Sequence, residues 1–543
     1  MQGEILPFSV LADKKNDYFC PVMKREVFRI ALILLLVCVC PGRSACADII
    51  VSGQKDFENL QRSVLRLIGS GAKNIRVLLQ EGTYYYNDRH LYLKDMQCDN
   101  VSISIEGQGQ CTLVSKGKTR RNGEPCEDWF NNQSTLLDSN LSEVSQWGET
   151  LQAKDTVRVV DAKTKTCFLP YMGLRPQPEE QCRNTYIMIT RWFTSAIYNI
   201  KRIDREGIYF TCTDLEYSTY LDAWNVNGDY GYYTKVGGHG ARFPRFKLCG
   251  VIGMRPLYID NKVYVRQDSL YECRASTFLS IEQSSLESFK VSGIEFKGNA
   301  YGWNRGVVMA QGSAFGKGMS LQGNTFRNLK TEALRVDSTD NVSFCGNKVE
   351  DCAIGVVRSE NNCRRTTVCD NRFVRCGLRF TNSFVVYCTG TDFLVKGNLF
   401  EDFGYSAIRS GVWWAQDMMH PCRGEICDNE MYYTDWYMSD IWKRTLMDSG
   451  AIYVATQTSG VNICRNSIHN YSGVYQNRGI FLDDGSSHCT VADNVVENIY
   501  GGYCIDLRKV TYKDNPRNKA REFNVGNVLR GNICDGKVRF ETF

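Results

Sequence analysis

This 543-residue sequence contains little proline and has a small net charge. It has 11 Pro against 46 Gly, and aromatic residues make up 12% of it, a balance that favours strands and tight turns. Its 65 Lys and Arg are nearly matched by 60 Asp and Glu, which leaves a net charge of +5 and no long basic run. Nucleic acid is therefore not expected as a partner.

Histidine and paired metal-ligand motifs are scarce as well. The sequence has 5 His, and Cys422-x4-Cys427 has no His or Cys pair at a matching distance. A structural zinc site needs four such ligands. No metal site is therefore expected.

The longest apolar run is too short to span a membrane. Residues 30–40 provide about half of the roughly 20 apolar residues that a spanning helix needs. Basic residues precede this run, and Ala45-Cys46-Ala47 follows it like the cleavage site of an export signal. We expect residues 1–47 to be an upstream extension plus a signal peptide, with the mature chain beginning near Asp48. The mature protein would then lack a transmembrane segment and be periplasmic, cell-surface or secreted.

An internal repeat indicates how a chain of this length folds. Because 543 residues are more than a single hydrophobic core usually accommodates, the chain must form either several domains or a solenoid. From residue 299 onward an Asn recurs in Gly-Asn, Asp-Asn or Arg-Asn pairs at steps of 23–38 residues, with an apolar residue three positions earlier. These markers are Asn299, Asn324, Asn347, Asn371, Asn398, Asn429, Asn466, Asn494 and Asn532.

The repeating unit is a coil of strands. Short β-branched and aromatic runs surround each Asn, and no helical periodicity is present. A second apolar strand recurs in most units, at residues 333–336, 407–408, 451–454, 479–482 and 504–507. Stacked Asn side chains can hydrogen-bond from one unit to the next, so the nine markers are expected to be structural.

The region before the repeats divides into a cap, first rungs and an insertion. Residues 56–68 predict one capped amphipathic helix, which would cover the open end of the coil, and residues 75–84 and 101–107 predict its first rungs. Residues 118–255 break the pattern but contain strand-like segments at 185–190 and 207–211. The predicted domains are therefore 48–117, an inserted β-rich subdomain at 118–255, and the main coil at 256–543.

This order of elements resembles the pectin-lyase-like proteins, which implies an all-β, right-handed parallel β-helix over about residues 48–535. Asp448-Ser-Gly-Ala-Ile-Tyr, followed by Gly479-Ile-Phe-Leu-Asp-Asp-Gly-Ser-Ser487, is similar to the D-x-G-A-I-Y…G-I-Y-L-D-D-G-x-S pattern of β-helix glycoside hydrolases. Family 141 is the nearest resemblance and family 120 a more distant one. Phe481 stands where the pattern has Tyr. The resemblance implies hydrolysis of a polysaccharide or oligosaccharide by paired Asp carboxylates in a monomer without a cofactor.

Strand geometry suggests which carboxylates could pair. With Ile480 and Leu482 inward, Phe481 and Asp483 point outward, so Asp483 is expected to be a surface carboxylate. Aligning Ile452, Ile480 and Ile505 places Tyr453, Phe481 and Asp506 in one outward column and Ala455, Asp483 and Arg508 in the next. The carboxyl groups of Asp483 and Asp506 could then converge as glycoside hydrolysis requires.

The partner of Asp483 remains open between two residues. The motif resemblance favours Asp448, whereas rung geometry favours Asp506, and Asp483 with Asp484 is common to both alternatives. An Asp-Asp-Gly at a strand end is also typical of a plain turn. The candidate substrate-binding residues on the same face are Arg335, Asp337, Arg409, Trp413, Trp414, Tyr453, Phe481 and Arg508.

Two other functions fit the same fold. A polysaccharide lyase would bind Ca²⁺ with Asp483, Asp484 and Asp506 and use Arg478, Arg508 or Lys509 as base. A non-catalytic carbohydrate-binding β-helix would carry the same acidic residues as a solvated face.

The register also predicts two cysteine contacts. Cys345 and Cys369, and likewise Cys427 and Cys464, stand two positions before successive Asn markers and should point outward. Stacked rungs bring such neighbours to about 4.8 Å between Cα atoms, which a disulfide tolerates.

Overall fold

The computed structural model describes twelve stretches of the coil and several short segments of the insertion. The coil stretches are 46–115, 277–298, 305–329, 331–352, 354–377, 384–411, 420–435, 449–455, 458–472, 477–483, 485–508 and 525–540. Residues 1–45 of the predicted extension and signal peptide lie outside the described residues, whereas Cys46 and Ala47 are described and begin the first strand of the coil. Within the described parts of the chain, no helix has the length and apolarity needed to cross a bilayer.

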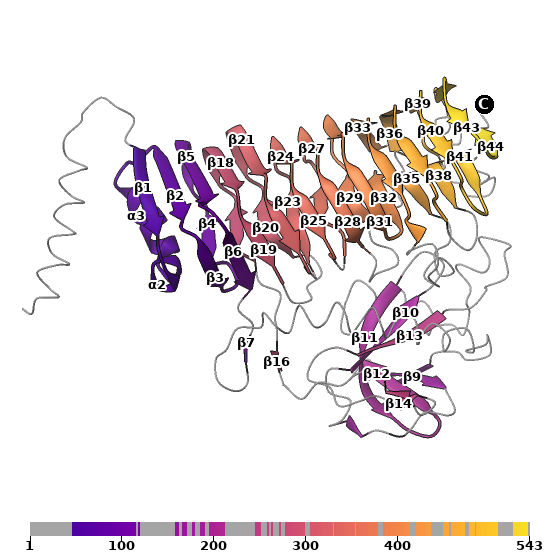
Figure 1. Ribbon diagram of the computed structural model, residues 1–543, viewed down its shortest axis with the longest axis horizontal. Coiled ribbons are helices and arrows are strands. Elements are labelled where there is room, and N and C mark those ends of the chain that lie inside the picture. The colour runs from indigo at the N-terminus through magenta and orange to yellow at the C-terminus, as the bar shows by residue number, and fades with distance from the viewer. Residues whose placement is uncertain are drawn as a thin grey trace, which may run out of the picture.

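Three long parallel sheets wind around one axis, with each turn of the chain adding a strand to each sheet. Figure 1 shows the coil running from its indigo N-terminal end to its yellow C-terminal end. Sheet A consists of β1 (Cys46–Val51), β2 (Asn74–Leu79), β5 (Gln97–Gly107), β18 (Ser285–Ser292), β21 (Ala314–Gln322), β24 (Val342–Cys345), β27 (Thr366–Cys369), β30 (Phe393–Lys396), β33 (His420–Cys427), β36 (Thr458–Cys464), β39 (Thr490–Ala492) and β42 (Val528–Arg530).

The other two sheets complete each rung. Sheet B consists of β3 (Gly82–Tyr86), β6 (Cys111–Ser115), β19 (Glu295–Lys297), β22 (Thr325–Arg327), β25 (Lys348–Glu350), β28 (Arg372–Cys376), β31 (Leu399–Phe403), β34 (Glu430–Tyr432), β37 (Ser467–His469), β40 (Val495–Glu497) and β43 (Ile533–Cys534). Sheet C consists of β4 (Leu91–Lys94), β17 (Leu279–Glu282), β20 (Gly306–Gln311), β23 (Glu332–Asp337), β26 (Val357–Glu360), β29 (Phe384–Cys388), β32 (Ser406–Ser410), β35 (Gly450–Val454), β38 (Arg478–Leu482), β41 (Tyr503–Leu507) and β44 (Val538–Phe540). The parallel β-helix predicted from the repeat is confirmed, and its second recurring strand is sheet C.

The N-terminal cap differs in one respect from the prediction. Two helices, α2 (Gln54–Glu58) and α3 (Leu60–Gly69), replace the single predicted helix, and the chain changes direction at Asn59, where φ is −91° and ψ is 1°. Phe57, Leu60 and Val64 are fully buried against the first rungs, as expected of the cap's apolar side.

An antiparallel sheet lies in the insertion, separate from the coil sheets. Its strands are β8 (Arg158–Asp161), β9 (Thr166–Pro170), β10 (Thr185–Thr190), β11 (Ser195–Ile203), β12 (Gly207–Thr211) and β13 (Arg245–Gly250). Beyond residue 255, the predicted end of the insertion, β14 (Tyr258–Ile259) pairs with β15 (Lys262–Val263) in a separate two-stranded sheet. The two predicted strand segments are therefore confirmed as β10 and β12. At the base of the insertion, β7 (Lys118–Thr119) pairs antiparallel with β16 (Tyr271–Glu272), and we call this pair the neck.

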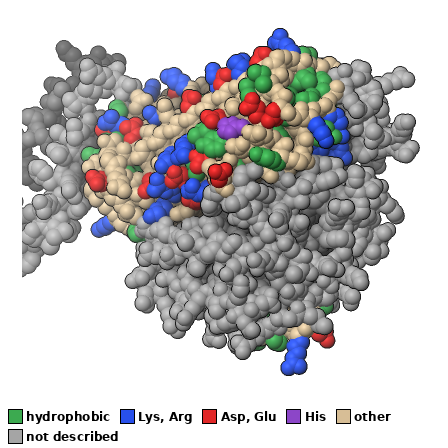
Figure 2. Space-filling model, turned by 45° about the vertical axis from the view of Figure 1, so that its right-hand side comes forward, with side chains coloured by type: hydrophobic (Ala, Val, Ile, Leu, Met, Phe, Trp, Pro, Cys, Tyr) green, Lys and Arg blue, Asp and Glu red, His purple; other side chains and the backbone are tan. Residues whose placement is uncertain are grey.

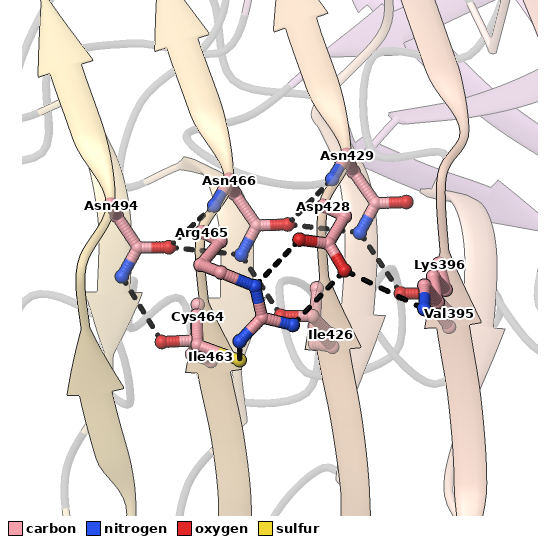
Figure 3. Close-up of polar contacts among 10 residues, drawn as sticks. All are labelled: Val395, Lys396, Ile426, Asp428, Asn429, Ile463, Cys464, Arg465, Asn466 and Asn494. Carbon is pink, nitrogen blue, oxygen red and sulfur yellow. Dashed lines mark hydrogen bonds and ion pairs between the residues drawn. The ribbon is translucent and has the colours of Figure 1, made fainter.

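The Asn markers form the predicted ladder. From Asn324 to Asn494, each side-chain amide donates to the side-chain oxygen of the next marker, at 2.8–3.3 Å. The same amide also donates to a backbone carbonyl one rung back, as Asn466 does to Ile426 at 2.9 Å. Figure 3 shows this pattern repeated through Asn429, Asn466 and Asn494.

Asn299 lies outside the described residues, but Phe296, three positions before it, shows that this unit was wrongly aligned with the ladder. Phe296 lies in sheet B and pairs with Phe326, whereas the corresponding residues of later units lie in sheet A. Ile294 occupies the ladder position of that rung, and its backbone N–H donates to Asn324 Oδ1 at 3.2 Å. The Gly-Asn pair at 298–299 therefore follows a sheet B strand, so the dipeptide alone did not identify the register.

The cysteine predictions test the same register. Cys345 and Cys369 are bonded to each other, with their Cα atoms 4.6 Å apart. Cys427 and Cys464 are register partners on β33 and β36, and both are free thiols in the structure. Both pairs are therefore neighbours, as predicted.

Pairs of opposite charge span the rungs on the outer surface. Arg372 contacts Glu401, Arg375 contacts Asp351, and Arg465 contacts Asp428, each at 2.6–2.8 Å. Figure 2 shows acidic and basic side chains next to one another on the described face of the coil. This interspersed arrangement agrees with the small net charge.

Candidate functional site

The outer face of sheet C carries the predicted site residues in columns. Register pairing places Tyr453, Phe481 and Asp506 side by side on successive rungs, as predicted. Pairing extends this column, which we call column 1, in both directions: its members are Arg335, Arg358, Tyr387, Arg409, Tyr453, Phe481, Asp506 and Arg539. The backbone N–H groups of Asp483 and Arg508 donate to Val454 and Leu482, which puts both residues in the next column.

The motif residues in these columns are buried, which corrects the expectation of an exposed face. Asp483 is 7% exposed, Tyr453 is 2% exposed and Phe481 is fully buried. Tyr453, Ala455 and Phe481 form a small apolar cluster apart from the main core. Large side chains stacked at the spacing of one rung, about 4.8 Å, cover one another, so outward direction does not imply contact with solvent here.

Asp506 is held in a buried ion pair. Its Oδ2 accepts from Arg478 Nε at 2.8 Å and from Arg539 Nη2 at 2.7 Å, and its Oδ1 accepts from Arg539 Nε at 2.6 Å. Arg478 is itself buried, and its guanidinium lies 3.9 Å from the centroid of the Phe481 ring. Two cations thus occupy both oxygens of Asp506, which makes it a poor acid, base or nucleophile and a good anchor for Arg478.

Asp483 is held differently. Its Oδ2 accepts a hydrogen bond from the hydroxyl of Tyr453 at 2.5 Å. Because Tyr453 is on the preceding rung, this contact links the two halves of the motif that resembles β-helix glycoside hydrolases.

Arg409 lies among aromatic rings. Its guanidinium carbon is 4.5 Å from the ring centroid of Phe384, 5.1 Å from that of Tyr387 and 5.4 Å from that of Tyr453. Burial lowers the pKa of Arg409, while the surrounding tyrosines oppose that shift. The side chain was predicted to bind substrate, and its 1% exposure fits a positioning role behind Tyr453 better.

A charged cluster lies further toward the N-terminus of the same face. Arg335 contacts Glu332 at 3.1 Å and Glu360 at 2.6 Å, and Arg358 contacts Glu360 at 2.6 Å and Glu332 at 3.7 Å. Burial raises the pKa of Glu332. Burial alone would lower the pKa of Arg358, but the two glutamates raise it above its usual value. This cluster is partly open to solvent, with the Arg358 side chain 31% exposed.

Sequence reasoning named Arg335 and Asp337 but missed Glu332, Arg358 and Glu360. Asp337 and Glu360 end neighbouring strands as register partners, and Asp337 accepts from Asn361 Nδ2 at 2.6 Å. Their separation by one repeat was visible in the sequence. The same argument that paired the cysteines could have paired these two carboxylates.

Four predicted site residues, Asp448, Asp484, Trp413 and Trp414, lie outside the described residues. Arg508, directly after β41, is half-buried. Among the residues that the structure describes, no three His, Cys, Asp or Glu side chains come together as a metal-binding group.

Comparison with known proteins bears on the fold. A family model described as "Right handed beta helix region" matches residues 257–400. The chain is a right-handed parallel β-helix. No curated protein matches the sequence significantly.

Solved structures with a similar chain path share little sequence with this right-handed β-helix. One described as "Glycoside hydrolase" is 11% identical, with 90% of this chain and 96% of that chain covered and a TM-score of 0.48. XylC in complex with xylose is 9% identical, covering 86% and 79%, with a TM-score of 0.37. The A-module of the mannuronan C-5 epimerase AlgE6 from Azotobacter vinelandii is 9% identical, covering 91% and 94%, with a TM-score of 0.34. Such identities do not transfer an activity.

Proposed function

We propose that this protein is an exported glycoside hydrolase that acts on a polysaccharide or oligosaccharide at the outer face of sheet C. The observation that carries the proposal is the contact between Tyr453 and Asp483. It joins two motif strands on successive rungs and orients a carboxylate next to the column that contains Arg409 and Phe481. Carboxylates, guanidinium groups and aromatic rings together are what recognition and cleavage of a sugar require.

In this proposal Asp483 is one of the two catalytic carboxylates. Tyr453 fixes its orientation through the hydrogen bond to Oδ2. The second carboxylate is Asp448 or Asp484, because Asp506 is committed to Arg478 and Arg539. Asp506 instead acts as a positioning residue that holds Arg478 against the ring of Phe481.

The remaining candidates divide by their surroundings. Arg335, Asp337 and Arg508 are only partly buried and would contact sugar hydroxyl groups, while Arg409 and Phe481 would support the site from behind. Trp413 and Trp414 would supply stacking surfaces for sugar rings.

A polysaccharide screen with substituted proteins tests the proposal. Asp483→Asn should abolish release of reducing sugar, and Asp448→Asn or Asp484→Asn should do the same for the partner carboxylate. Asp370→Asn is the matched control, because Asp370 is exposed in the turn after sheet A strand β27. Full activity of Asp483→Asn would contradict the assignment.

Stability must be measured beside activity because Asp483 is buried. Asn retains the shape of Asp, and its amide oxygen can still accept from Tyr453, so the melting temperature should change little. Loss of activity with an unchanged melting temperature would separate a chemical role from a structural one.

The same screen separates the two alternatives. A Ca²⁺-dependent lyase would form an unsaturated product that absorbs in the ultraviolet and would lose activity in a chelator. Its proposed ligand Asp506 and proposed base Arg478 bind each other, which weighs against it. Glycan binding without cleavage, unchanged in Asp483→Asn, would support a binding protein instead.

A further inference from the structure

The coil carries two pairs of cysteines at equivalent positions on sheet A. Cys345 and Cys369, on β24 and β27, form a disulfide that joins neighbouring rungs. Cys427 and Cys464, on β33 and β36, are likewise register partners, and each stands two positions before its ladder Asn. Register partners in neighbouring parallel strands lie about 4.8 Å apart, within the range a disulfide spans.

The surroundings of the second pair give its two thiols different roles. Cys464 is half-buried, and its Sγ accepts a hydrogen bond from Arg465 Nη1 at 3.4 Å. The same guanidinium is held by Asp428, with Nε to Oδ1 at 2.7 Å and Nη2 to Oδ2 at 3.0 Å (Figure 3). Cys427 is 2% exposed, and burial raises its pKa to about 12. The accessible thiol is therefore Cys464. Burial raises its pKa as well, and the Arg465 cation beside it opposes that rise by stabilising the thiolate.

We propose that Cys427 and Cys464 are a redox modification site that closes a second disulfide between rungs by exchange with a low-molecular-weight disulfide. The thiolate of Cys464 attacks the small disulfide, forms a mixed disulfide and releases one small thiolate. Cys427 then loses its proton and attacks Sγ of Cys464, which releases the second small thiolate. The protein loses two protons and two electrons, and the small disulfide is reduced to two thiols.

The segment that this bond would close is the part of the chain next to the proposed catalytic face. It contains β34, β35 with Tyr453, and Asp448. Both ends of this segment lie on neighbouring strands of sheet A, and the segment between them passes through sheets B and C. Oxidation would therefore bond its two ends to each other. The inference does not depend on the proposed activity.

Mass spectrometry of the full chain tests the proposal. The protein is incubated with glutathione disulfide at about pH 8, alkylated without unfolding, and digested. The expected product is a peptide pair linked through Cys427 and Cys464, absent from Cys427→Ser and Cys464→Ser. Alkylation of both thiols, or glutathione retained on Cys464 beside a free Cys427, would overturn the proposal.

An interior pair provides the matched control. Cys352 and Cys376 also lie on neighbouring rungs, but they are 1% and 0% exposed, so glutathione disulfide cannot reach them. They should become alkylated only after unfolding. Arg465→Gln should slow closure of the 427–464 bond several-fold and Arg465→Lys should slow it less, whereas equal rates in all three proteins would overturn the role given to Arg465.

Discussion

Asp506 shows how a carboxylate on an outer face can be structural. It is fully buried between Arg478, also buried, and Arg539, whose side chain is 37% exposed. Asp506→Asn should reduce the free energy of unfolding by about 3–5 kcal/mol, because it leaves the Arg478 charge buried without its partner. Urea denaturation measures this loss.

Two further variants serve as controls for the predicted loss of stability. Arg539→Gln should cost clearly less, since Arg539 reaches solvent and Asp506 keeps Arg478. Asp483→Asn should also cost less, since the amide oxygen of Asn can still accept the hydrogen bond from Tyr453. Equal losses in all three variants would mean that Asp506 does not anchor Arg478.

Glu332 gives a prediction about pH. Because burial raises its pKa, the folded chain holds a proton there more tightly than the unfolded chain does. The stability contributed by this group is therefore present below the unfolded-state pKa, about 4.3, and is lost as pH rises through the folded-state pKa. The free energy of unfolding of the native protein relative to Glu332→Gln should fall as pH is raised from about 4 to 7. A difference that is independent of pH in urea titrations would contradict this.

At the residue scale, the sequence predicted the direction in which side chains point better than it predicted the residues that surround them. Strand alternation correctly placed Tyr453, Phe481 and Asp506 in one outward column. It could not predict their burial, because alternation fixes where a side chain points and not what packs over it. The ion pair of Asp506 was missed for the same reason: Arg478 precedes Ile480 by two residues and Arg539 lies on β44, a rung that the repeat analysis did not assign to sheet C.

The Asn ladder is the element that holds successive rungs in register. Asn398 accepts from the backbone N–H and the side-chain amide of Asn371 and donates to Asn429 and to the carbonyl of Val368. Asn398→Ala should reduce the free energy of unfolding by about 3 kcal/mol or more, because at least two buried donors of Asn371 lose their acceptor. Thermal or urea denaturation measures the loss.

The end of the ladder supplies the control. Asn532 is half-buried in the last rung, where water can replace part of its contacts. Asn532→Ala should therefore be clearly milder than Asn398→Ala. The opposite order would show that the ladder does not stabilise the interior of the coil.

Elements were predictable where the same pattern recurred. Eight of the nine Asn markers correctly gave the register of sheets A and B. Each of these markers follows an apolar residue of a sheet A strand and precedes an apolar residue or Cys of a sheet B strand. Asn299 failed because a Gly-Asn pair also suits the end of a sheet B strand. The break between α2 and α3 was not predictable from amphipathic spacing, which continues unchanged across Asn59.

At the scale of the whole molecule, the strands described in the insertion all lie outside the three coil sheets. Replacing residues 120–270 by a short Gly-Ser turn would leave the neck, whose backbone pairs Tyr271 with Thr119. The shortened chain should keep the far-ultraviolet circular dichroism of a β-helix, a cooperative thermal transition and the Cys345–Cys369 bond. Loss of the cooperative transition would show that the coil depends on the insertion.

The pairing of β5 with β18 across the insertion has a consequence for biosynthesis. Contacts between the first rungs and the main coil join residues 183–191 positions apart, whereas later rungs join neighbours a few tens of residues apart. At a translation rate of about 5–20 residues per second, the N-terminal rungs wait roughly 10–40 s for their partner strands. During that time β5 and β6 are an open sheet edge of the kind that templates aggregation. The cap protects the opposite end of the coil, so the incompletely folded chain has one vulnerable side, and a chaperone would be needed there first.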